Sequence, residues 1–191
     1  MSFRAALSHV RGSGYIPSKI QYILSILQQI TAQETTAKFI LFSAFAPMIQ
    51  TLQTALTQAR IPFVTIDGSA PLDKRAKMVE AFQNPGGPSV CILSSRAGNA
   101  GLTLTAANHL IFVEPNMNIA VDAQAIGRVN RMGQLRQVTI HRLLAEGTVE
   151  ERIQRLILDG TLSPHGYDKY TFTSTGERDL VLSQMKFLFQ A

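Results

Sequence analysis

SVCILSSRAGNAGLTLTAANHLIFVE, residues 89–114, decides the fold, because it places two nearly continuous apolar runs around a turn of small residues. The runs cover residues 89–95 and 109–114 and contain valine, isoleucine, leucine and phenylalanine. Apolar runs of this length without polar alternation are typical of strands that are buried on both faces. The stretch therefore predicts two neighbouring strands of a parallel sheet.

The same pattern recurs elsewhere in the chain. Three more apolar runs predict strands at residues 38–45, 62–67 and 138–144. Between the runs, apolar residues follow the spacing of amphipathic helices, first over residues 20–27 and then over residues 48–56. Strands that alternate with helices in this way predict an α/β fold, a mostly parallel sheet with helices on both faces.

The predicted topology also says where to look for ligands. Right-handed crossovers bring the carboxyl ends of parallel strands to one edge of the sheet, and open α/β sheets bind their ligands at that edge. We therefore expect functional side chains in the loops that follow residues 45, 67, 95 and 114.

Composition limits the function further. Hydrophobic residues make up 46% of the chain, yet no apolar run reaches the roughly 18 residues that a membrane-spanning helix needs. The single cysteine, Cys91, lies in an apolar run, which excludes a multi-cysteine metal site and fits a reduced intracellular compartment. We expect no bound metal and no membrane partner.

The net charge of +5 favours an anionic partner. Basic residues gather in two groups, Lys74, Arg75 and Lys77 in the first and Arg128, Arg131, Arg136 and Arg142 in the second.

An arginine motif, QAIGRVNRMGQ at residues 124–134, is the strongest chemical signal. On a helix, Gln124, Arg128 and Arg131 are spaced i, i+4 and i+7 and project from one face, and Gly133 is a natural helix stop. Guanidinium groups hold phosphate oxygens in a bidentate manner. The spacing also fits a solvated arginine face paired with acidic neighbours, so spacing alone leaves both interpretations open.

The turn at residues 94–105, SSRAGNAGLTLT, is a second candidate for phosphate binding. Small residues and glycines let a backbone approach a ligand closely, and backbone N–H groups in such turns bind phosphate. An ordinary strand-to-helix turn that needs glycine for its backbone angles explains the same composition.

Taken in order, these segments resemble the C-terminal helicase lobe of the Swi/Snf-type ATPases of helicase superfamily 2. The resemblance covers roughly residues 18–158. The sequences that carry it are KFILFSAF (38–45), IDGSAPLDKR (66–75), LSSRAGNAGLTLTAANHLIFVEPNMN (93–118), QAIGRVNRMGQ (124–134) and RQVTIHRLLAEGTVEERI (136–153). The residues 113–115 and LSQMKFLF (182–189) are most similar to the branch with histone-linker, PHD and RING modules that acts as a ubiquitin ligase.

The resemblance implies a RecA-like three-layer lobe that faces a second lobe, with ATP in the cleft between them. It implies that Arg131 is the arginine finger, that Arg128 is its companion at the γ-phosphate, and that Gln124 orients this helix or the attacking water. Gly101 and Glu114 would line the nucleotide side. The residues implied for contacts with the phosphates of double-stranded DNA are Ser43, Arg75, Ser94, Ser95 and Arg96.

The sequence also departs from the family pattern. Thr103 stands where asparagine is usual, Glu114 replaces aspartate, Asn130 stands where histidine is common, and residues 117–119 lack the usual tryptophan. No Gly-x-x-x-x-Gly-Lys-Ser/Thr phosphate loop occurs, so an N-terminal RecA-like lobe would have to hold ATP and Mg²⁺. The alternative is a catalytically uncoupled lobe that serves as a scaffold for DNA or a protein.

The remaining expectations concern organisation. Residues 1–17 predict a linker, residues 18–158 the lobe, and residues 159–191 a polar loop followed by a short C-terminal helix. We expect a monomer that acts on chromatin, and hence a nuclear protein in a eukaryote or a cytoplasmic one otherwise. Without the second lobe, the chain is expected to hydrolyse ATP at a negligible rate.

Overall fold

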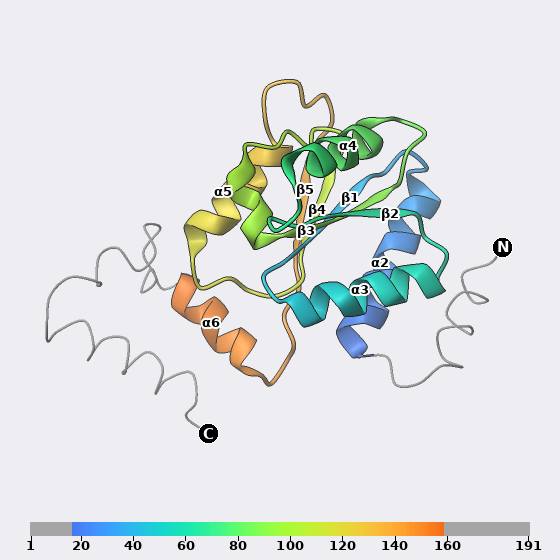
Figure 1. Ribbon diagram of the computed structural model, residues 1–191. Coiled ribbons are helices and arrows are strands. Elements are labelled where there is room, and N and C mark those ends of the chain that lie inside the picture. Colours follow the sequence, from blue (N-terminus) through green and yellow to red (C-terminus); the bar gives the residue numbers. More distant parts are fainter. Residues whose placement is uncertain (1–16, 159–191) are drawn as a thin grey trace, which may run out of the picture.

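A five-stranded parallel sheet forms the centre of the computed structural model, which describes residues 17–158 apart from the side chains of residues 98–100 (Figure 1). The order of the strands is β2-β3-β1-β4-β5. Their bounds are β1 Phe39–Ser43, β2 Phe63–Ile66, β3 Val90–Ser94, β4 His109–Phe112 and β5 Thr139–Arg142. Each lies within the run that predicted it, so the α/β fold is confirmed.

Helices cover both faces of the sheet. The helices are α2 Ser18–Gln33, α3 Ala46–Gln58, α4 Leu72–Gln83, α5 Ile119–Val129 and α6 Val149–Leu158, and a 3₁₀ helix, η1, spans Ser95–Ala100. Helices α2 and α3 cover one face of the sheet, and α4 and α5 cover the other (Figure 1). Their buried side chains form one core on each face. The result is the three-layer arrangement that the alternation of strands and helices predicts.

The two cores explain why the strands are apolar along their whole length. Alternate residues of β1 point to opposite faces, so Leu41 packs in the core under α2 and α3, and Phe42 packs in the core under α4 and α5. Phe82 on α4 and Leu24 on α2 are at most 1% exposed and fill these two cores. Burial on both sides leaves no solvent-facing position for a polar residue on the central strands.

The arginine-bearing helix is shorter than its sequence predicts. α5 ends at Val129, and Asn130 already has non-helical backbone angles (φ −88°, ψ 79°), so Arg131 and Gly133 lie beyond the helix. The carbonyls of the last turn have partners outside it. Arg128 O accepts from Leu104 N at 2.9 Å, and Val129 O accepts from Gln134 Nε2 at 3.2 Å. These contacts satisfy carbonyls that the end of a helix leaves without intrahelical partners, and the helix thus ends before Gly133.

An ion pair joins α6 to α2. Lys19 Nζ on α2 lies 2.5 Å from Glu150 Oε1 on α6. Thr148 Oγ1 accepts from Glu150 N at 3.2 Å and caps the helix. No helix within residues 17–158 is long and apolar enough to cross a membrane. The expected linker before residue 17 and the loop and helix of residues 159–191 lie outside the described residues and stay predictions.

Candidate functional site

Both central strands end on a serine at the carboxyl edge of the sheet. Ser43 ends β1 and Ser94 ends β3, and the two are paired in register. Each hydroxyl donates to a carboxylate that follows the outer neighbouring strand. Ser43 Oγ donates to Glu114 Oε1 at 2.8 Å, and Ser94 Oγ donates to Asp67 Oδ1 at 2.8 Å. Two matched serine–carboxylate pairs therefore fix the loops at this edge.

These pairs change the interpretation of the two serines. Ser43 is fully buried and Ser94 is 5% exposed, and their hydroxyls are engaged with the carboxylates. Neither hydroxyl is therefore available to a DNA phosphate in this conformation, contrary to the expectation from the family resemblance. The sequence carried a signal for this arrangement, because Asp67 and Glu114 are the last residues of two predicted strands, but the pairing of serine and carboxylate depends on the strand order.

Glu114 likewise holds the chain together rather than facing an open site. It is 9% exposed, and its Oε1 also accepts from Ala44 N at 2.6 Å. Its Oε2 is buried and has no partner among the described residues. Burial raises the pKa of Glu114 above the ordinary range, against the hydrogen bonds from Ala44 and Ser43, which lower it. Its expected place on the nucleotide side is therefore not supported by its surroundings.

Asp67 connects β2 to the turn after β3. Its second oxygen accepts from Ser69 Oγ at 2.8 Å, and Gly68 N donates to Ser94 Oγ at 3.3 Å. Hydrogen bonds from Ser69 and Ser94 lower the pKa of Asp67, so the carboxylate is charged at neutral pH. Gly68 also lies directly against the backbone of Arg96. A Cβ on Gly68 would come within 2.7 Å of the carbonyl carbon of Arg96.

The basic side chains at this edge differ in exposure. Arg96 on η1 is exposed, as are Lys74 and Lys77 on α4, while Ser95 is half-buried. Arg75 is half-buried, and its Nε is buried with no hydrogen-bond partner among the described residues. Arg96 and the two lysines therefore remain accessible to an anion at the carboxyl edge.

The motif arginines lie toward the opposite edge. α5 starts after β4 ends and runs back toward the start of β5, so its last turn and Arg131 approach the amino edge of the sheet. Arg131 Nη1 donates to Thr103 Oγ1 at 3.1 Å, and Thr103 O accepts from Gln83 Nε2 at 3.1 Å, at the end of α4. The helix therefore carries Gln124 and Arg128 but not Arg131, and the expectation that all three project from one helical face is corrected in its helical bounds.

The accessibility of the motif side chains is nevertheless high. Gln124 and Arg131 are exposed, and Arg128 is half-buried in the last turn of α5. Gly101 is exposed and has a left-handed backbone (φ 66°), with no atom within 4 Å of a Cβ built on it. These four residues lie on the surface of the lobe, and the structure does not bring them together with Glu114.

The remaining arginines of the expected basic cluster are engaged within the fold. Arg136 donates to the carbonyl of Thr36 at 2.9 Å and lies 3.4 Å from Glu34. Arg142 pairs with Asp122 and stacks over the ring of Phe112, 4.6 Å from its centroid. Asp122 is 4% exposed, and burial raises its pKa, against the lowering effect of Arg142. Arg136 and Arg142 therefore hold the lobe together and do not extend an anion-binding surface.

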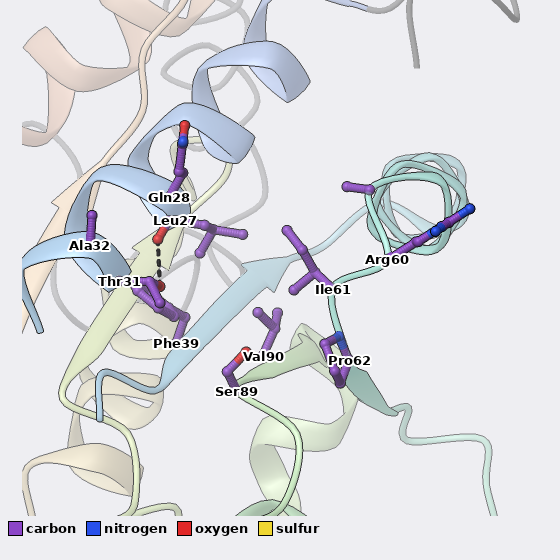
Figure 2. Close-up of a pocket in the computed structure, with 11 residues that line it drawn as sticks. Leu27, Gln28, Thr31, Ala32, Phe39, Arg60, Ile61, Pro62, Ser89 and Val90 are labelled. Atoms are coloured by element: carbon purple, nitrogen blue, oxygen red, sulfur yellow. Dashed lines mark hydrogen bonds between the residues drawn. The ribbon is translucent and has the colours of Figure 1, made fainter. Parts of the chain in front are cut away.

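A cavity of about 420 Å³ lies at the amino edge, away from the serine–carboxylate pairs. Figure 2 shows its lining, in which Leu27, Phe39 and Ile61 come from α2, β1 and the loop before β2. Thr31 on its wall donates to the carbonyl of Leu27 at 2.6 Å. The cavity contains no residue of the predicted site. Within residues 17–158, no group of three or more His, Cys, Asp or Glu side chains is placed to hold a metal ion.

The chain is similar in fold to part of a known ATPase domain and similar in sequence to DNA repair proteins. The C-terminal part of the Fun30 ATPase domain superposes with a TM-score of 0.73 at 25% identity, over 89% of this chain and 53% of that chain. Human DNA repair and recombination protein RAD54-like is 36% identical over 169 residues, which cover 87% of this chain and 22% of that protein. These likenesses confirm the RecA-like form of the lobe.

The chain spans only a small part of the length of two further relatives. DNA repair protein RAD5 of Gibberella zeae is 35% identical over 139 residues, 73% of this chain and 12% of that protein. Human chromatin-remodeling ATPase INO80 is 37% identical over 133 residues, 64% of this chain and 8% of that protein. Residues 18–133, more than half of the chain, match the helicase conserved C-terminal domain. The chain therefore belongs to the helicase conserved C-terminal domain family and has homologues of the Swi/Snf type.

Proposed function

We propose that this chain is the second motor lobe of an ATP-dependent translocase that acts on double-stranded DNA in repair or chromatin remodelling. This proposal rests on one observation. The family match and the motifs quoted above fall together on one RecA-like lobe that lacks a phosphate loop. Relatives whose names denote DNA repair and chromatin remodelling support the same conclusion. A nuclear location and a monomeric state belong to this proposal, and the ubiquitin-ligase branch stays a prediction.

On the nucleotide side, Arg128 and Arg131 are proposed to reach ATP that is held, with Mg²⁺, by an N-terminal lobe. Arg131 is exposed, and it donates to the neutral hydroxyl of Thr103, which a phosphate oxygen can replace at little electrostatic cost. A guanidinium at that position stabilises charge on the transferring phosphoryl group. Gln124, one turn before Arg128, would orient the helix or the attacking water.

The surroundings of these arginines support contact with another lobe. Met132 is 98% exposed and Leu135 is 96% exposed, although their loop is braced by Gln134, whose Nε2 donates to Ala107 O at 2.7 Å. Gly127 has no atom within 4 Å of a Cβ built on it, so nothing within the described lobe requires glycine there. Met132 and Leu135 thus offer apolar surface beside Arg131 that a second lobe would cover.

On the DNA side, the proposal assigns backbone contacts to the carboxyl edge. Arg96, Lys74 and Lys77 are exposed there, and Arg75 and Ser95 lie among them. Contacts between such side chains and phosphates give binding that is independent of sequence and falls steeply with salt. Ser43 and Ser94 would act indirectly, through the loops that their hydroxyls hold.

The test is duplex binding by the purified chain at several salt concentrations. Arg96→Ala is expected to weaken binding and to reduce the salt slope by about one. Arg136→Ala removes the same charge from an arginine that is engaged within the fold, and it is expected to leave the slope unchanged. Equal slopes for wild type and Arg96→Ala would contradict the assignment of the DNA side.

The uncoupled scaffold remains the second candidate. It is favoured by the hydrogen bond between Arg131 and Thr103, because threonine stands where the family usually has asparagine. A scaffold would bind DNA with the same salt dependence but would not need Arg131 for any activity. ATP hydrolysis by the protein with both lobes therefore separates the two candidates.

A further inference from the structure

The turn after β3 is fixed by a bracket that we define as Asp67, Gly68 and Ser94. Ser94 Oγ donates to Asp67 Oδ1 at 2.8 Å and accepts from Gly68 N at 3.3 Å. The Ser94 side chain is thus held from both sides by the loop after β2. This loop and the turn after β3 are adjacent because β2 and β3 pair in register.

The bracket reaches Arg96 through direct packing. Gly68 lies so close to the Arg96 backbone that a Cβ would come within 2.7 Å of both its carbonyl carbon and its carbonyl oxygen. Contact at this distance is made with the backbone, which cannot move away as a flexible side chain can. The position of the Arg96 main chain, and with it the direction of its exposed side chain, therefore depends on the loop at residues 67–68.

The charge of Asp67 and its hydrogen bonds should act on DNA binding in opposite directions. A carboxylate next to a surface that binds phosphates repels the ligand, so on electrostatic grounds its removal should strengthen DNA binding. Its hydrogen bonds to Ser94 and Ser69 have the opposite effect, since they order the loop before DNA arrives. The two effects predict opposite signs for the same substitution.

We propose that Asp67 is a positioning residue for DNA-backbone contact, acting through Ser94 and Gly68 to hold the turn that carries Arg96. The proposal rests on the proposed function, because it presupposes that this edge meets DNA phosphates. The loop after β2 would thus support DNA binding, although the negative charge of Asp67 by itself would repel DNA.

The experiment measures duplex affinity of the full chain at one low salt concentration for three charge-matched variants. Asp67→Ala removes the charge and both acceptors, whereas Asp67→Asn removes the same charge and keeps the Oδ1 acceptor for Ser94. Asp73→Ala removes an exposed carboxylate from the first turn of α4 nearby. We expect Asp67→Ala to bind about tenfold more weakly, Asp67→Asn to bind within about twofold of wild type, and Asp73→Ala to bind equally or more tightly.

A double-mutant cycle separates positioning from a general loss of stability. Ser94→Ala breaks the bracket from the other side without changing the charge, and it should weaken binding by itself. Added to Asp67→Ala, it should weaken binding less than it does alone, because both substitutions remove the same Ser94–Asp67 hydrogen bond. Urea unfolding identifies conditions in which every variant is folded, and affinities are compared there. If Asp67→Ala proves too unstable, Ser94→Ala against wild type carries the test.

The outcomes distinguish this inference from the proposed function. Equal or tighter binding by both Asp67 variants, with Arg96→Ala still weaker than wild type, overturns the role of Asp67 alone. Binding by the wild type that is insensitive to salt and to Arg96→Ala overturns the proposed DNA side as well. Weak binding by Asp67→Ala, rescued by asparagine, supports both.

Discussion

Glu114 accepts hydrogen bonds from the Ser43 hydroxyl at 2.8 Å and from the Ala44 amide at 2.6 Å, and so it ties the end of β1 to the end of β4. The family resemblance implies a place for this glutamate beside the nucleotide. In the structure it is a buried acceptor whose second oxygen has no partner among the described residues.

The first prediction follows from the burial of Glu114, which raises the pKa of its carboxyl group. When the pKa of a carboxyl group is higher in the folded state than in the unfolded state, its contribution to the free energy of unfolding is fully present below the unfolded pKa. This contribution is lost as the pH rises through the folded pKa. Glu114→Gln keeps an acceptor and is uncharged. We therefore expect the free energy of unfolding of Glu114→Gln to improve relative to wild type as the pH rises above the ordinary glutamate range.

Urea unfolding over a series of pH values checks this prediction. The matched control is Glu146→Gln on the exposed loop before α6. The raised pKa would be contradicted if the free energies of unfolding of Glu114→Gln and wild type differed by the same amount at every pH, after the effect of Glu146→Gln is subtracted.

The second prediction concerns Arg142 and Asp122. Asp122 is 4% exposed, so Arg142→Ala leaves a buried carboxylate without its partner. Because the Arg142 side chain is itself 39% exposed, water screens part of the loss, and we expect the free energy of unfolding to fall by about 2 kcal/mol. Arg142→Lys keeps the charge and should lose less. Arg155→Ala, at an exposed arginine, is the control. If Arg142→Ala lowers the free energy of unfolding no more than Arg155→Ala does, Arg142 does not stabilise the buried Asp122 carboxylate.

The third prediction pairs two glycines with opposite expected effects. Gly68→Ala places a Cβ against the Arg96 backbone, and we expect a loss of stability of about 1–3 kcal/mol. Gly127→Ala places a Cβ in open space within α5, and we expect a gain of about 0.5–1 kcal/mol from the higher helix propensity of alanine. Thermal unfolding measures both.

The same Gly127→Ala variant also tests the proposed contact between lobes. If another lobe packs on α5, the added methyl group should reduce ATP hydrolysis by the protein with both lobes, although it stabilises the isolated chain. A variant that is stabilised and fully active would indicate that nothing approaches Gly127.

The fold was predictable because its signals are local. Each strand is an apolar run such as residues 90–94, and α2 shows a buried stripe of Ile20, Ile23, Leu24 and Leu27. Both depend on neighbouring residues in the sequence, so the sheet with helices on both faces could be predicted before the strand order was known.

The site was less predictable because its contacts join distant segments. Leu104 and Gln134 donate hydrogen bonds to carbonyls in the last turn of α5. Leu104 lies outside residues 119–134, so the spacing of residues within that range could not predict its contact. The engagement of Ser43 by Glu114 likewise requires β1 and β4 to be neighbours. The family assignment survives these corrections because it rests on the order of the motifs, not on one helical stripe.

ATP hydrolysis by a protein that joins this lobe to a phosphate-binding lobe tests the proposed role of Arg131. With saturating duplex DNA, we expect Arg131→Ala to lower kcat by about 10³ and Arg155→Ala, at an exposed arginine on α6, to leave kcat unchanged. DNA-stimulated turnover by Arg131→Ala equal to that of the wild type would contradict the account.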